Sequence, residues 1–157
     1  MKKVFFVPHL GLGDHFTCNG MTREIYKQYD MMVMPVKENN VKVVRRMFSD
    51  LINLHILPVN GSMDYSDTQH MQDVFALMNF FGSRNYEIKS VGAFNPSTFH
   101  RHEKKYDEVF YEQVNIPFEK RWSSFDYPRN IELEMKMFHE CFNLVESEYI
   151  FLHDDPD

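Results

Sequence analysis

Chemistry-bearing side chains gather near the amino terminus, where an apolar run ends in VPHLGLGDHF. Asp14 stands there between His9 and His15 and follows two glycines, Gly11 and Gly13. A carboxylate at the end of a buried strand is a candidate general base, and the glycines permit a tight turn and a close approach to a ligand. Two interpretations stay open: Asp14 only caps a helix, or it belongs to a site for an oxygen-rich substrate.

The glycine spacing differs from that of the common phosphate-binding loops. Gly11 and Gly13 give G-x-G, but Phe16 stands where the dinucleotide fingerprint has its third glycine, and no G-K-[ST] follows. A helix beginning at about Asp14 would still point its free backbone amides at the strand edge, which suits an oxygen-rich group such as phosphate.

A second candidate group lies in the segment PFEKRWSSF, which contains Arg121 and the chain's single tryptophan, Trp122. Aromatic faces stack against sugar rings, and arginine binds phosphates and hydroxyls. The alternative is a solvated loop anchored by one buried tryptophan. No H-E-x-x-H or C-x-x-C spacing is present, so no metal is predicted.

The composition limits the classes of partner. With 17 basic and 23 acidic side chains the net charge is −6, which argues against a nucleic-acid interface. No apolar run approaches the length of a membrane span. The two cysteines, Cys18 and Cys141, lie far apart in the sequence, as in a reducing compartment. We therefore expect a cytoplasmic protein that binds neither nucleic acid nor membrane.

The elements that would position these side chains alternate along the chain. Apolar runs predict five strands: Lys3–Val7, Met31–Val36, Leu54–Val59, Tyr86–Gly92 and Glu148–His153. Helical periodicity lies between the strands, most clearly in the stripe Ile131, Met135, Phe138, Phe142 and Val145. This alternation predicts an α/β fold: one Rossmann-like domain over residues 1–157, a three-layer sandwich with a mainly parallel sheet of about five strands and helices on both faces.

The segment HLGLGDHFTCNGMTREI resembles the first strand, loop and helix of glycosyltransferases with the two-domain GT-B fold. It is similar to the bacterial lipopolysaccharide heptosyltransferases, whose first loop carries Gly-Asp before a helix. The motif-level likeness covers Pro8–Arg23, and the whole chain resembles one Rossmann-like half. In that family the matching acid is the proposed base that deprotonates the acceptor hydroxyl, which implies this role for Asp14.

The resemblance implies an N-terminal, acceptor-side domain with a nucleotide-sugar donor as co-substrate, a sugar-containing acceptor, and no cofactor or essential metal. The residues expected to bind substrate are His9, Gly11, Leu12, Gly13, His15, Arg121 and Trp122. The family's second domain, with most donor contacts, has no counterpart in the 157 residues. We therefore expect a half-enzyme that is inactive alone and that forms a homodimer through the apolar face its second domain would cover.

Two other interpretations stay open. One is a stand-alone Rossmann-like module that binds a nucleotide or phosphorylated metabolite without catalysis. The other is a truncated reading frame that folds but has no function alone.

Overall fold

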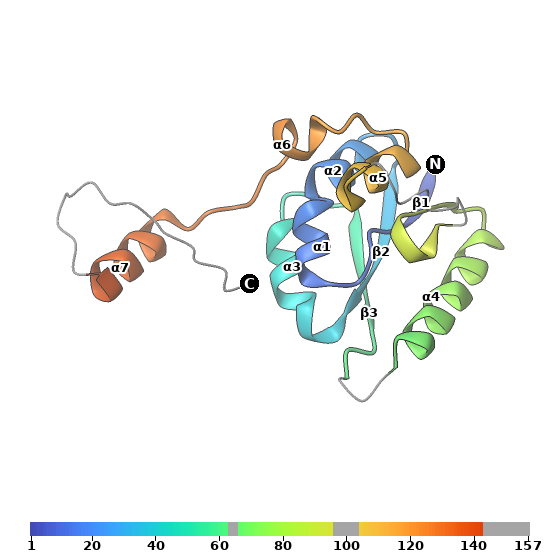
Figure 1. Ribbon diagram of the computed structural model, residues 1–157, viewed down its shortest axis with the longest axis horizontal. Helices are drawn as coiled ribbons and strands as arrows, with labels where there is room; N and C mark the ends of the chain where they lie inside the picture. Colours follow the sequence, from blue (N-terminus) through green and yellow to red (C-terminus); the bar gives the residue numbers. More distant parts are fainter. Residues whose placement is uncertain (63–65, 96–103, 143–157) are drawn as a thin grey trace.

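The structure, a computed structural model, describes residues 1–62, 66–95 and 104–142 (Figure 1). Its sheet contains the strands β1 (Lys3–Val7), β2 (Met31–Lys37), β3 (Leu54–Val59) and β4 (Glu87–Ser90). All pairings are parallel, and the strand order is β3-β2-β1-β4. The predicted α/β fold is therefore confirmed with four strands, while the predicted strand Glu148–His153 lies outside the described residues.

Helices cover both faces of the sheet. One face carries α1 (Leu12–Thr17), α2 (Asn19–Tyr26), α3 (Val41–Met47), α5 (Tyr106–Gln113) and α6 (Lys120–Ser123), and the other carries α4 (Asp67–Gly82) (Figure 1). Two short 3₁₀ helices, η1 (Glu38–Asn40) and η2 (Gly92–Phe94), follow β2 and β4. Because the strands are parallel, these turns lie at the same edge of the sheet as the loop after β1.

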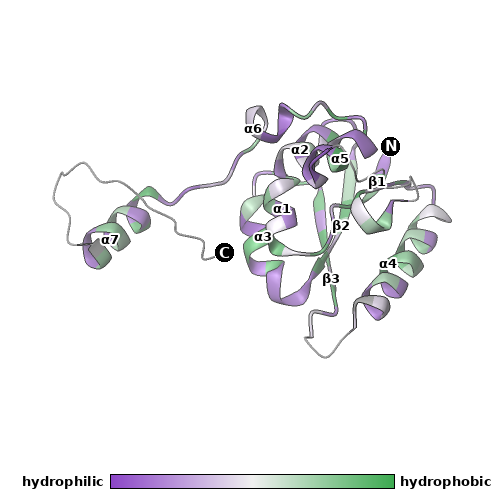
Figure 2. Cartoon of the chain, viewed as in Figure 1, coloured by the Kyte–Doolittle hydropathy of each residue, from purple (hydrophilic) through white to green (hydrophobic). Residues whose placement is uncertain are grey.

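The core has two halves because successive strand residues point to opposite faces. Val4 and Phe6 of β1 pack with α2, α3 and α5, whereas Phe5 and Val7 pack toward α4. Phe5 stacks on Phe81 of α4 with ring centroids 4.5 Å apart. Figure 2 shows the matching concentration of hydrophobic residues along the strands. Burial of both faces explains why the central strands β1 and β2 appear in the sequence as continuous apolar runs.

The helical segment after β1 differs from the predicted helix. The prediction began one helix at about Asp14, but α1 begins at Leu12 and α2 follows after Cys18. Asn19, the first residue of α2, is buried, and its side-chain amide exchanges two hydrogen bonds with the backbone of Asp126, at 2.9 and 3.1 Å. This contact fixes the start of α2 against a segment more than 100 residues away.

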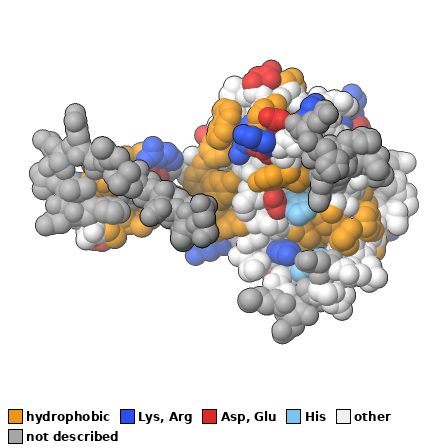
Figure 3. All heavy atoms as spheres, viewed as in Figure 1, with side chains coloured by type: hydrophobic (Ala, Val, Ile, Leu, Met, Phe, Trp, Pro, Cys, Tyr) orange, Lys and Arg blue, Asp and Glu red, His pale blue; other side chains and the backbone are white. Residues whose placement is uncertain are grey.

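The helix α7 (Ile131–Phe142) lies apart from the sheet, beyond an extended segment (Figure 1). The predicted helical periodicity is confirmed from Ile131 to Phe142, while Val145 lies outside the described residues. Ile131, Leu133, Met135 and Met137 are all about half exposed. Hydrophobic side chains also gather on the part of the body that faces this helix (Figure 3). In the described part of the chain, no helix combines the length and the apolar character needed to cross a membrane.

Candidate functional site

The loop after β1 turns at a histidine rather than at a glycine. His9 has φ = 70°, a left-handed conformation that is uncommon for residues with a Cβ, whereas Gly11 has φ = −71°. Close packing surrounds the ring: a Cβ on Gly92 would lie 2.9 Å from Cδ2 of His9. Strained backbone of this kind concentrates at functional sites, so His9 is the first residue of the candidate site.

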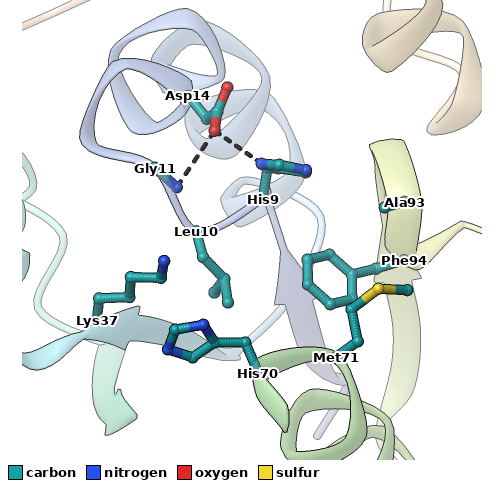
Figure 4. Close-up of a pocket in the computed structure, with 9 residues that line it drawn as sticks. All are labelled: His9, Leu10, Gly11, Asp14, Lys37, His70, Met71, Ala93 and Phe94. Carbon is teal, nitrogen blue, oxygen red and sulfur yellow. Dashed lines mark hydrogen bonds and ion pairs between the residues drawn. The ribbon is translucent and has the colours of Figure 1, made fainter. Parts of the chain in front are cut away.

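The side chains of His9 and Asp14 form a pair. Nδ1 of His9 lies 2.7 Å from Oδ2 of Asp14, and the same oxygen accepts the backbone N–H of Gly11 at 3.2 Å (Figure 4). A Cβ on Gly11 would lie 2.6 Å from that oxygen. A side chain at Gly11 would therefore displace the Asp14 carboxylate, which occupies that space. Its amide donates within the loop, and this differs from the expectation that it faces a ligand.

The charge of Asp14 determines which atom of His9 holds the proton. Burial alone would raise the pKa of Asp14, but the hydrogen bond and charge of His9, with the Gly11 amide, outweigh it and lower the pKa below its ordinary value. An ionised carboxylate only accepts hydrogen bonds, so Nδ1 of His9 donates to it. In the neutral ring Nε2 is then an acceptor, the arrangement that a general base requires.

A pocket of ≈ 340 Å³ adjoins this pair. Its walls come from the segments after β1 and β4, from the last residue of β2 and from the first turns of α4 (Figure 4). The lining residues are His9, Leu10, Gly11, Asp14, Lys37, His70, Met71, Ala93 and Phe94. Because β1 lies between β2 and β4, the chain direction across the sheet reverses here, and ligands of open parallel sheets bind at such a point. The volume lies within the ~300–1,000 Å³ of small-molecule sites.

Two ionisable pocket residues, Lys37 and His70, were not among the predicted site residues. Lys37 is the last residue of β2, so the rule that ligands bind beyond the carboxyl ends of strands could have identified it. His70 is buried on α4, and its Nε2 lies 2.8 Å from the carbonyl oxygen of Asn60. Only the folded chain shows that this face of α4 borders the pocket.

His15 was predicted to bind substrate, but it does not line the pocket. Its side chain is fully buried, and neither ring nitrogen has a hydrogen-bond partner within the described chain. Burial lowers the pKa of His15 to about 4, against the opposing charge of Asp14. The neutral ring is therefore a core residue under α1. Leu12 packs against the core and Gly13 is exposed, so neither lines the pocket.

Arg121 and Trp122 are also outside the pocket, because α6 packs against α2 (Figure 1). The guanidinium of Arg121 pairs with the buried Asp107 of α5, which explains its position structurally. Trp122 is 69% exposed and lies beside Arg121, with the guanidinium 4.6 Å from its ring centroid. The expected buried tryptophan anchor is therefore wrong, and substrate binding by these two residues stays a prediction.

Within residues 1–62, 66–95 and 104–142, no three His, Cys, Asp or Glu side chains group as metal ligands would. Comparison of the chain with protein-family models, curated proteins and solved structures found no significant match.

Proposed function

We propose that the chain is the acceptor-side domain of a glycosyltransferase, which moves a sugar from a nucleotide-sugar donor to a hydroxyl of a sugar-containing acceptor. The observation that carries the proposal is the His9–Asp14 pair. It combines an imidazole held by a carboxylate at 2.7 Å with a pocket at the carboxyl edge of the sheet. In Figure 4 the second ring nitrogen of His9 points away from Asp14, which leaves it available to a ligand.

The proposed step is a single displacement. The acceptor hydroxyl donates a hydrogen bond to Nε2 of His9 and passes its proton there as its oxygen attacks the anomeric carbon of the donor sugar. A new carbon–oxygen bond forms, the bond from that carbon to the nucleoside diphosphate breaks, and the diphosphate leaves with the electron pair. Asp14 stabilises the imidazolium.

This assignment revises the role expected for Asp14. Its Oδ2 already accepts hydrogen bonds from His9 and Gly11, so we assign Asp14 as the positioning residue and His9 as the base. In the two-domain enzymes that the sequence resembles, most donor contacts come from the second domain. The proposal therefore assigns only acceptor binding and proton removal to this chain.

A second candidate function is a module that binds a nucleotide or phosphorylated metabolite without catalysis. The observation in its favour is the cation of Lys37 in the pocket wall, because phosphate groups pair with lysine.

Binding experiments separate the two functions. We expect mono- and disaccharides to shift the backbone amide NMR signals of His9, Gly11 and Phe94 in the ¹⁵N-labelled protein. His9→Asn keeps a residue type that tolerates a positive φ and should weaken sugar binding by about fivefold, since one hydrogen bond contributes ~1 kcal/mol. The matched control is His55→Asn, on β3 and outside the pocket. Shifts with nucleotides but with no sugar would instead support the binding module.

A further inference from the structure

Lys37 is positioned for a ligand by the alternation of β2. Met32, Met34 and Val36 pack on the α2 and α3 side, whereas Val33 packs on the α4 side. Alternate residues share a face, so Lys37 belongs to the α4 side, where the pocket lies. It is half-buried at the end of the strand, and in Figure 4 its side chain extends along the pocket opposite His9.

The ammonium group of Lys37 has no counter-ion among the residues that the structure describes. Among the described residues that line the pocket, Asp14 alone carries a carboxylate, and it is held by His9 and the Gly11 amide. The neighbouring walls include Leu10, Met71 and Phe94, which carry no negative charge. A partly desolvated cation in such a place is stabilised by an anionic ligand.

The positions of Lys37 and His9 fit one ligand. Lys37 ends β2 and His9 follows β1, and these two strands are paired neighbours in the sheet. Neighbouring strands lie ~4.8 Å apart. A small molecule in the pocket can therefore reach both side chains. An anionic group belongs on the Lys37 side of the pocket because the negative charge of Asp14 lies beside His9, away from Lys37 (Figure 4).

We propose that the acceptor is an acidic sugar, whose phosphate or carboxylate group pairs with the ammonium of Lys37 while one of its hydroxyls meets Nε2 of His9. This inference rests on the proposed function, because it names the substrate class of the same pocket. Lys37 selects the acceptor and His9 removes its proton.

The test compares glucose, glucose 6-phosphate and glucuronate by NMR titration of the full chain, with inorganic phosphate and a nucleoside diphosphate as further probes. We expect at least one of the two acidic sugars to bind about tenfold more tightly than glucose. Lys37→Met should remove this preference and Lys37→Arg should keep most of it. Lys42→Met, which removes an exposed lysine of α3 outside the pocket, is the matched control for net charge.

The outcomes separate this inference from the proposed function. Equal binding of all three sugars, unchanged by Lys37→Met, overturns the acidic acceptor and leaves the sugar site standing. Binding of phosphate or the diphosphate that depends on Lys37, without binding of any sugar, overturns both proposals and supports the module. Absence of every Lys37-dependent shift also overturns the inference. A preference that separates glucose 6-phosphate from glucuronate identifies the anionic group.

Discussion

Two clusters of charged side chains near α1 and α2 differ in how many of their hydrogen-bonding atoms are already used. The Arg23 side chain is 8% exposed and donates to Asn19, Asp50 and the carbonyl oxygens of Met47 and Asp126, so that all three guanidinium nitrogens have acceptors. The His9–Asp14 pair uses one ring nitrogen of His9 in its hydrogen bond, and both residues line a pocket. The first cluster joins distant segments of the fold, whereas the second retains an atom that can act on a ligand.

Arg23→Met should have the largest effect on stability. The variant leaves the carbonyl oxygen of Met47 and the carboxylate of Asp50 without Arg23, whereas the carbonyl oxygen of Asp126 keeps the Asn19 amide. Because Asp50 is 42% exposed, we expect a loss of about 3 kcal/mol rather than the full cost of an unpaired buried charge. Urea denaturation measures this loss. Ligand-induced shifts at His9 in the remaining folded protein should be unchanged. A loss below about 1 kcal/mol would show that the cluster does not hold the fold.

His15 should make the free energy of unfolding depend on pH. Its pKa is about 4 in the folded chain and about 6.5 in an unfolded one, so the unfolded state binds the proton first. The contribution of the neutral His15 side chain to the free energy of unfolding is therefore fully present above about pH 6.5. It is lost as the pH decreases toward 4, by a total of about 3 kcal/mol.

His15→Leu should remove most of this pH dependence. It should also raise stability at pH 7 by about 1 kcal/mol, because two unpaired buried nitrogens are replaced by apolar atoms. Urea denaturation at several pH values provides the measurement. If the free energy of unfolding depended on pH equally in both proteins between pH 4 and 6.5, His15 would not be the source of the pH dependence.

Gly11→Ala and Gly13→Ala form a matched pair with opposite predictions. A Cβ on Gly11 meets the Asp14 carboxylate, whereas a Cβ on Gly13 has no atom within 4 Å. We expect Gly11→Ala to lower stability by about 1–2 kcal/mol and to separate Asp14 from His9. Gly13→Ala should raise stability by about 0.5–1 kcal/mol through helix propensity. Thermal denaturation of both variants tests this, and equal effects would show that the carboxylate does not occupy that space.

Trp122→Ala should have the smallest effect. The side chain is 69% exposed, so we expect a stability change within about 0.5 kcal/mol and unchanged sugar binding by the pocket. A tenfold loss of sugar binding would restore the substrate-binding role that the sequence predicts for Arg121 and Trp122.

The strands of the sheet could be predicted because each one corresponds to a short apolar run in the sequence. Lys3–Val7 and Leu54–Val59 match β1 and β3, and Met31–Val36 falls one residue short of β2. Burial on both faces requires continuous apolar runs, which are visible in the sequence. The break between α1 and α2 depends on contacts of Asn19 with Asp126, and no local pattern encodes such a contact.

The candidate site could be predicted only where it follows a strand directly. His9, Gly11 and Asp14 lie beyond β1 and were identified from that position. His15 was wrongly included because the sequence does not show that its side chain turns into the core. Arg121 has the residue type expected for a phosphate contact, but its pairing with Asp107 directs it elsewhere. Residue type therefore indicated the chemistry, and tertiary contacts decided which residues reach the pocket.

The tautomer of His9 tests the central claim most directly. Long-range ¹H–¹⁵N NMR at pH 8.5, above the ordinary pKa of imidazole, distinguishes a proton on Nδ1 from one on Nε2, and the exposed His55 provides an internal reference. Because Nδ1 faces the ionised Asp14, we expect the proton on Nδ1 and a lone pair on Nε2. A proton on Nε2 would contradict His9 as the base that Asp14 holds ready for an acceptor hydroxyl.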